Sequence, residues 1–106
     1  MTEAARINLK DLIATQTGIH SDRLAAVRSD PVRADAPIVV AKDPAGVENY
    51  VLDGHSRVVH AAEQGKYDIN AVLKDDSGIG RAQAMMVKDA LGTNSFVKVT
   101  DLKTHK

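Results

Sequence analysis

The chain has 106 residues, of which 43% are hydrophobic and 26% charged, a composition ordinary for one soluble globular domain. Lys plus Arg number 14 and Asp plus Glu number 14, so the net charge of zero argues against a protein that coats DNA by bulk positive charge. The lack of cysteine excludes disulfide scaffolds, thiolate zinc sites and cysteine nucleophiles, and 3% aromatic residues argue against a base-stacking platform for single strands.

In the first third of the chain, the residue pattern predicts a short strand and a short helix separated by polar stretches. Residues 6–9 predict a short strand, and residues 12–18 pass from an apolar pair into a polar stretch. Ser21 or Asp22 is expected to cap a short helix. That helix is expected to end near Pro31, because the residue before a proline disfavours helical geometry.

A β-hairpin is the clearest expectation for the middle of the chain. Residues 31–37 are expected to be a polar connector, and residues 37–41 are β-branched and apolar, as in a buried strand. Residues 43–46 read Asp-Pro-Ala-Gly, the preference pattern of a type I turn. Residues 49–52 then predict the returning strand.

A helix and a strand are expected to follow the hairpin. Residues 58–64 predict a helix, and Gly65 stands where a left-handed cap would end it. The residues expected to share the apolar face of this helix are Val58, Ala61 and Ala62. Residues 67–73 alternate as in a half-buried strand. The residues expected on its apolar face are Tyr67, Ile69, Ala71 and Leu73.

The C-terminal third predicts a loop, a helix and a last strand. Residues 75–80 are expected to be a loop, which includes the weak Gly-Ile-Gly-Arg signal at residues 78–81. Residues 81–91 predict a helix ended by Gly92, and residues 95–99 predict a strand. The apolar face of the helix is expected to hold Ala82, Met85, Met86 and Val87, with the methionines filling the core.

A binding or catalytic site is expected at residues 53–57, where the returning strand meets the next helix. A helix N-terminus offers unpaired backbone N–H groups and about half a positive charge, and Gly54 lets the backbone approach a ligand. The Ser56 hydroxyl can donate a hydrogen bond, and the Arg57 fork can hold two phosphate oxygens. Together these groups predict an anion site, most naturally for phosphate, in which Asp53 or His55 orients a metal ion, a ligand hydroxyl or a proton.

A purely structural interpretation of the same residues stays open. Asp53 can be only a turn or N-cap residue, Gly54 only a backbone requirement, and Arg57 a solvated surface charge. His60 is expected to be exposed on the helix, and His20 and His105 have no partners at the spacing of zinc ligands, so no metal site is predicted.

The order of these segments resembles the ParB/sulfiredoxin-like superfamily, in particular its ParB N-terminal-like domain, over about residues 7–74. The resemblance rests on the strand opened by Pro37, on the turn at residues 50–57 (Tyr-Val-Leu-Asp-Gly-His-Ser-Arg), on residues 61–65 and on the strand at residues 69–73. It implies an α+β fold, a small mixed sheet with flanking helices, in a single domain of residues 1–106. The core is expected at about 7–74, with a C-terminal helix and a possible strand at 81–100.

The resemblance also implies nucleotide or phosphate binding at Gly54, His55, Ser56 and Arg57, with ATP or CTP and Mg²⁺ as the ligand. Sulfiredoxins carry a cysteine in this turn, where His55 stands here, so that activity is excluded. ParB clamps have a Gly-Glu-Arg-Arg turn and a DNA-reading domain, for which this chain has no room. Free-serine kinases share an Asp-Gly-His-x-Arg turn and use a glutamate base, near whose place Asp11 or Gln16 stands.

Three functions remain open at this point. The first is a plasmid- or phage-type nucleotide-binding module that acts with DNA or a DNA-handling partner. The second is a phosphotransferase or nuclease in which His55 or Asp53 is the general base. The third is a protein-interaction module that has lost the ligand and exposes an apolar patch. No targeting or membrane segment is visible, so the cytoplasm is the expected location and no membrane partner is predicted.

Overall fold

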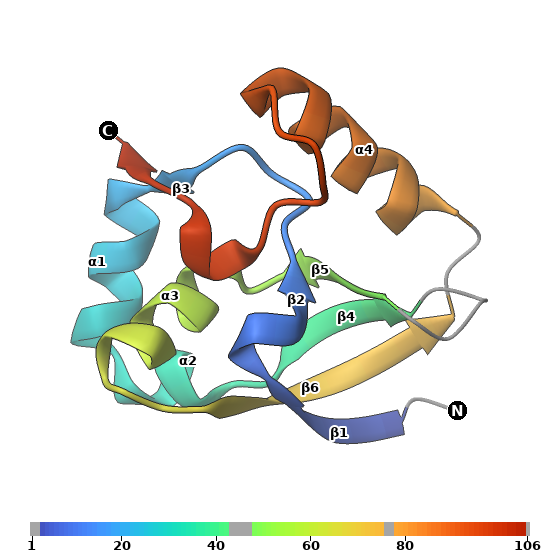
Figure 1. Ribbon diagram of the computed structural model, residues 1–106. Helices are drawn as coiled ribbons and strands as arrows, with labels where there is room; N and C mark the ends of the chain where they lie inside the picture. Colours follow the sequence, from blue (N-terminus) through green and yellow to red (C-terminus); the bar gives the residue numbers. More distant parts are fainter. Residues whose placement is uncertain (1–2, 43–47, 76–77, 106) are drawn as a thin grey trace.

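The computed structural model describes residues 3–42, 48–75 and 78–105 and is built around a five-stranded mixed sheet (Figure 1). The strands lie in the order β1-β6-β4-β5-β2. The β1/β6 and β4/β5 pairs are antiparallel, and the β6/β4 and β5/β2 pairs are parallel. The strands are β1 Glu3–Asn8, β2 Leu12–Ile13, β4 Ile38–Lys42, β5 Asn49–Asp53 and β6 Asp68–Asp75.

Helices flank this sheet, and a small parallel pair joins the segment before α1 to the C-terminal strand. Helix α1 packs on α3, and α2 packs on both of them. The pair consists of β3 Ile19–His20 and β7 Thr104–His105. The helices are α1 Ser21–Ser29, α2 Pro31–Asp35, α3 His55–Glu63 and α4 Ile79–Leu91, with short 3₁₀ turns η1 Leu9–Asp11 and η2 Val99–Asp101.

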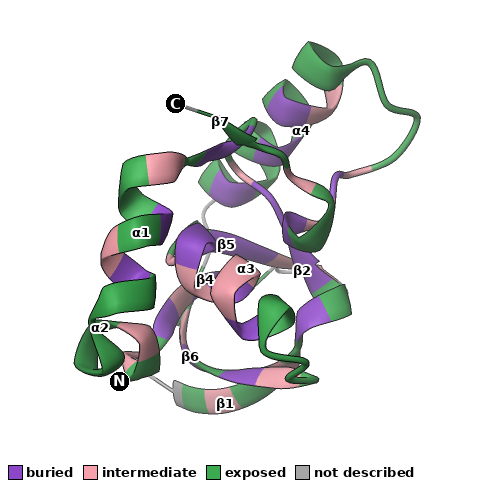
Figure 2. Ribbon diagram, turned by 90° about the vertical axis from the view of Figure 1, so that its left-hand side faces the viewer, coloured by how far each residue is buried: buried purple, intermediate pink, exposed green. Residues whose placement is uncertain are grey.

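Neighbouring side chains of a strand point to opposite sides of the sheet. The central strands are buried on both faces, because each face packs against a different hydrophobic cluster. On β5, Val51 belongs to the main core beneath α3, whereas Tyr50 belongs to a second cluster with Ala84 of α4 and Phe96. The Tyr50 and Phe96 rings meet edge to face, with centroids 5.8 Å apart. Figure 2 shows the buried residues of β2, β5 and α3 together in the middle of the molecule, with the exposed surface of α1 outside.

The expected hairpin is confirmed by the antiparallel pairing of β4 with β5. The predicted turn at residues 43–46 lies outside the described residues. Pro37 immediately precedes β4, and the β-branched residues Ile38 and Val40 are fully buried. The β-branched pattern therefore predicted a strand that lies at the centre of the sheet.

Helix α3 begins and ends at glycines with positive φ. Gly54 is its N-cap, with φ +109°, and a Cβ there would lie 2.5 Å from Cγ2 of Ile38. At the other end, Gly65 has φ +75°, as expected, and the Lys66 N–H donates to the Ala61 carbonyl at 3.0 Å. This pattern is a Schellman ending, so the chain turns sharply from α3 toward β6.

Two expectations around the first helix were wrong. The cap of α1 is neither Ser21 nor Asp22 but His20, whose Nδ1 accepts the Asp22 N–H at 3.3 Å. The expected connector at 31–37 contains α2, because Asp30 accepts the N–H groups of its first turn and Pro31 stands at the first helical position. The predicted end of α1 before Pro31 is confirmed.

The strand β1 runs over residues 3–8 rather than 6–9, because all six of its residues pair with residues 68–73 of β6 and Leu9 already starts η1. Strand β6 begins at Asp68, so Tyr67 is not on its apolar face but is 84% exposed. Ala62 is also exposed, whereas Val58 and Ala61 are buried as expected.

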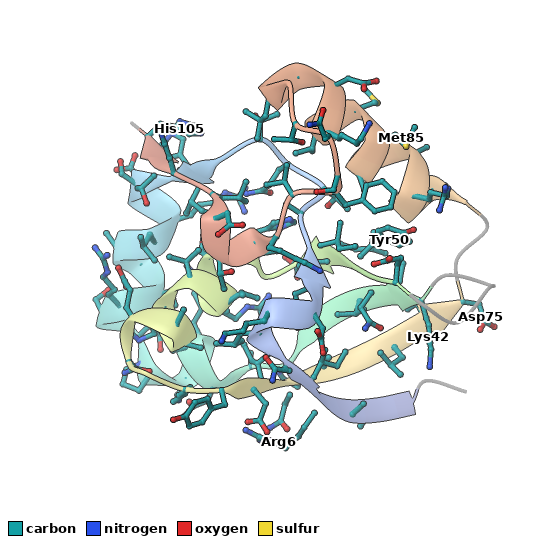
Figure 3. All side chains as sticks on the ribbon, in the orientation of Figure 1. Arg6, Lys42, Tyr50, Asp75, Met85 and His105 are labelled. Atoms are coloured by element: carbon teal, nitrogen blue, oxygen red, sulfur yellow. The ribbon has the colours of Figure 1, made fainter. Side chains whose placement is uncertain are left out.

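The C-terminal expectations were wrong in three respects. Helix α4 begins at Ile79, so the second glycine of the expected loop lies in its first turn. Its buried residues are Gly80, Ala84 and Val87, while Ala82, Met85 and Met86 are exposed. Residues 95–99 form no strand within the described chain except one bridge between Lys98 and Ile13, because this segment inserts Val97 and Val99 into the core instead. Figure 3 shows Met85 on the outside of α4.

Candidate functional site

A cavity of about 1130 Å³ lies between α1, α2 and the start of α3. Its wall includes every residue of the expected site turn, from Asp53 to Arg57. The wall also includes residues of α1 and α2 and of the loop at residues 16–18, together with His20, Asp30, Ala36, Leu52 and His105. This volume is slightly above the roughly 300–1,000 Å³ typical of small-molecule pockets, so the cavity has room for a ligand of nucleotide size.

The first turn of α3 presents unpaired backbone amides to this cavity. The first helical hydrogen bond runs from the Val58 N–H to the Gly54 carbonyl at 3.0 Å. The N–H groups of His55, Ser56 and Arg57 therefore have no acceptor in the described part of the chain, and no side chain caps the helix. Buried amides are nearly always paired with protein, water or a ligand, so these N–H groups are available to an acceptor in the cavity.

Ser56 adds a hydroxyl to the same turn. Ser56 is only 9% exposed and lines the cavity. Its hydroxyl has no hydrogen-bond partner among the described residues. A buried hydroxyl without a partner costs free energy that a bound anion would recover. Ser56 therefore points to a ligand independently of the helix terminus.

His55 is buried and engaged with the neighbouring loop. Its Nε2 accepts the Thr15 N–H at 3.1 Å, so the neutral ring carries its proton on Nδ1. Burial lowers the pKa of His55 from 6.5 to about 4, against a smaller opposing effect of the Asp53 charge. The ring is thus neutral at physiological pH, and it holds the loop at residues 15–18 against α3 rather than offering Nε2 to a substrate.

This pKa predicts a loss of stability on mild acidification. The unfolded state takes up a proton near pH 6.5 and the folded state only near pH 4, so stability falls as the pH drops through this window. Between pH 7 and pH 5 the free energy of unfolding is expected to fall by about 2 kcal/mol. Urea unfolding of the wild type and of His55→Gln measures this difference. An equal fall in both proteins would assign the pH dependence to other groups.

Arg57 is less solvated than a surface charge, because its side chain is only 13% exposed. Nη1 donates to the carbonyls of Ala36 and Pro37 at 3.3 and 3.0 Å, and Nη2 donates to Oδ2 of Asp53 at 3.1 Å. Nε–H has no acceptor among the residues described and lies over Gly54, 3.2 Å from the position of an added Cβ. The guanidinium is therefore fixed beside the α3 amides, with Nε–H left for a ligand.

Asp53 lies at the end of β5, and its side chain is 67% exposed. One carboxylate oxygen accepts from Arg57, which leaves the other open to solvent. The two expected candidates for the general base thus differ in access, because the lone pair of His55 Nε2 is occupied whereas the Asp53 carboxylate faces outward.

The other three histidines, and the two residues that stand near the place of the kinase glutamate, Asp11 and Gln16, differ in their distance from the cavity. His60 is partly buried, with its side chain 17% exposed, and faces Glu63. His20 and His105 are brought together by the β3/β7 pair, with ring centroids 5.8 Å apart. Within residues 3–42, 48–75 and 78–105, no three His, Asp or Glu residues are grouped to hold a metal ion. Gln16 lines the cavity, whereas Asp11 is on η1 outside its wall.

Several cavity residues were missed from the sequence. Arg23 and Arg33 are exposed on the wall, and Gly18, His20 and His105 line it as well. Asp30 followed by Pro31 is a helix-start signal that locates α2 and thus Arg33. No local signal exists for His105, because its place depends on pairing across the whole chain.

The sheet order, the helices on it and the glycine turn that opens α3 define a ParB-like fold. Two solved structures show the same fold: protein Atu1540 from Agrobacterium tumefaciens and a C-terminally truncated chromosome-partitioning protein ParB from Caulobacter crescentus complexed with CTP-gamma-S. The first has a TM-score of 0.64 at 15% identity, and the match covers 98% of this chain and 63% of that one. The second has a TM-score of 0.54 at 11% identity, and the match covers 88% and 55%.

The comparisons confirm the expected α+β, ParB-like fold. This chain spans less than two thirds of either neighbour, and a likeness at such low identity carries the fold alone. No family model matches the sequence, and no curated protein is similar to it in sequence. No helix in the described parts of the chain is long and apolar enough to cross a membrane.

Proposed function

We propose that this protein binds a phosphate-containing ligand, a nucleotide such as ATP or CTP, at the N-terminus of α3. One observation carries the proposal: the three unpaired amides of His55, Ser56 and Arg57 open, with the buried Ser56 hydroxyl, onto a cavity of about 1130 Å³. A helix N-terminus favours negative charge, and phosphate oxygens accept several N–H groups at once. The CTP analogue bound to the ParB neighbour supports the choice of a nucleotide.

In this proposal each residue of the turn has one role. The amides and the Ser56 hydroxyl hold one phosphate group, Nε–H of Arg57 donates a hydrogen bond to it, and the guanidinium charge, which also pairs with Asp53, attracts it. The open oxygen of Asp53 takes a Mg²⁺ ion that arrives with the nucleotide, since Mg²⁺ is commonly held by one carboxylate and the substrate phosphates. The module acts with DNA or a DNA-handling partner, as the chromosome-partitioning function of the ParB neighbour suggests.

Calorimetric titration with ATP, CTP and ADP, with and without Mg²⁺, tests the proposal. Arg57→Ala is expected to weaken binding about tenfold or more, because it removes a charge-assisted hydrogen bond, and Ser56→Ala about fivefold. Arg6→Ala is the matched control, since Arg6 is an exposed arginine paired with Asp68 outside the cavity wall. It is expected to bind as the wild type does.

The proposal fails if the wild type binds none of these nucleotides at millimolar concentration. It also fails if Arg6→Ala and Arg57→Ala weaken binding equally, because a general charge effect would then explain the loss.

The solvent exposure of the Asp53 carboxylate favours a second candidate function, a phosphotransfer or nuclease reaction with Asp53 as the general base. Product analysis with free serine and with plasmid DNA, on the wild type and Asp53→Asn, tests that reaction.

A further inference from the structure

The C-terminal strand contributes His105 to the wall of the cavity. Arg57 is tied to Ala36, just after α2, whereas His105 of β7 lies beside β3 at the other end of α1 (Figures 1 and 3). Helix α1 has 9 residues, so its ends are about 13 Å apart. The cavity is lined from one end of α1 to the other, so a single phosphate at α3 does not fill it, whereas an extended ligand has room to reach His105.

His105 has a fixed position on this wall. Strand β7 pairs with β3, and the Ile19 N–H donates to the Lys103 carbonyl at 2.9 Å. The imidazole lies directly against the loop backbone, since a Cβ on Gly18 would be 2.6 Å from its Cδ2. The same ring meets His20 edge to face.

The loop under His105 is also fixed to the phosphate end of the cavity. Thr15 donates its N–H to His55 and its hydroxyl to the Val51 carbonyl. Gln16 Nε2 donates to the Gly18 carbonyl at 2.8 Å. A continuous set of contacts thus sets the position of the His105 ring relative to the α3 turn, which is the preorganisation that a binding site needs.

We propose that His105 contacts the planar base of a nucleotide whose phosphate is held by the first turn of α3. The inference rests on the proposed function and narrows its ligand to a nucleoside phosphate rather than inorganic phosphate or polyphosphate. The described wall residues include no Phe, Tyr or Trp, and His55 is buried, so the exposed aromatic rings on the described wall are the imidazoles of His20 and His105. Stacking between bases and planar side chains is tolerant of base identity and contributes substantially to affinity.

Variants of His105 and of Gly18, whose backbone the His105 ring contacts, test whether His105 contacts the base. His105→Ala removes the ring, and Gly18→Ala places a Cβ where the ring lies and displaces it. Each is expected to weaken ATP or CTP binding about fivefold or more while tripolyphosphate affinity stays within about twofold. The double variant is expected to be no worse than the singles, since both remove one contact. Thr104→Ala, on the same strand but outside the cavity wall, is the control.

A direct readout separates this inference from the proposed function. The chain has 4 histidines, so their ring signals can be followed by NMR, and those of His105 are expected to shift with ATP or CTP but not with tripolyphosphate. If nucleotides bind without a shift at His105, or if His105→Ala weakens tripolyphosphate equally, the inference is overturned while the phosphate site stands. If the wild type binds neither ligand, the proposed function fails and the inference with it.

Discussion

Replacing Gly54 with alanine is expected to lower the free energy of unfolding by about 2–5 kcal/mol. Two effects add at this position. The φ of +109° is a conformation that side chains with a Cβ rarely adopt, and the added Cβ would lie 2.5 Å from Cγ2 of the fully buried Ile38. Ile38 is packed in the core on the central strand β4, so it has no room to move aside. Urea unfolding of the variant measures the loss.

Gly65→Ala separates the two effects. Gly65 also has a positive φ, +75°, but a Cβ there would meet nothing within 4 Å. Its loss is expected to be about 1–2 kcal/mol, the cost of the backbone conformation alone. Equal losses in the two variants would contradict the packing argument at Gly54, and the structural requirement for glycine at the start of α3 would then be conformational only.

Tyr50→Ala is expected to destabilise the protein by about 3–5 kcal/mol, as large aromatic truncations in cores do. Tyr50 is fully buried and lies between β5 and α4, where its ring meets Phe96 (Figure 3). Because Ala84 joins α4 to the same cluster, the loss of the ring is also expected to increase amide hydrogen exchange along α4. Denaturant unfolding and hydrogen exchange measure the two effects.

Tyr50→Phe is the matched control, because it keeps the ring and removes only the hydroxyl. Its expected loss is about 1 kcal/mol, the typical contribution of one hydrogen bond. Unchanged exchange along α4 in Tyr50→Ala would show that the helix is held by contacts other than this cluster.

Local signals explain why the hairpin and α3 were predictable. The β-branched run at residues 38–40 specifies a strand, and the glycines at 54 and 65 specify where α3 starts and stops. Each of these signals acts within a few residues, so no distant partner is needed to recognise it. The segment that holds the candidate phosphate site was therefore identifiable from the sequence.

Local periodicity failed where long-range contacts determine which side is buried. Met85 and Met86 lie on a helix that is buried among the described residues at Gly80, Ala84 and Val87, so their side of the helix remains exposed. Residues 95–99 have strand propensity, but they cross the core and place Val97 and Val99 inside it without a strand partner. In both cases the neighbouring elements, not the intrinsic propensity, determined the outcome.

By itself, the sequence determined the α+β character, the hairpin, the glycine turn at residues 53–57 and the absence of cysteine chemistry. Only the tertiary structure placed Arg57 on the carbonyls of Ala36 and Pro37, buried His55 against Thr15 and brought His105 to the cavity wall. The physical reason is distance along the chain: turns and caps are local, whereas a cavity is formed by segments that meet only after folding.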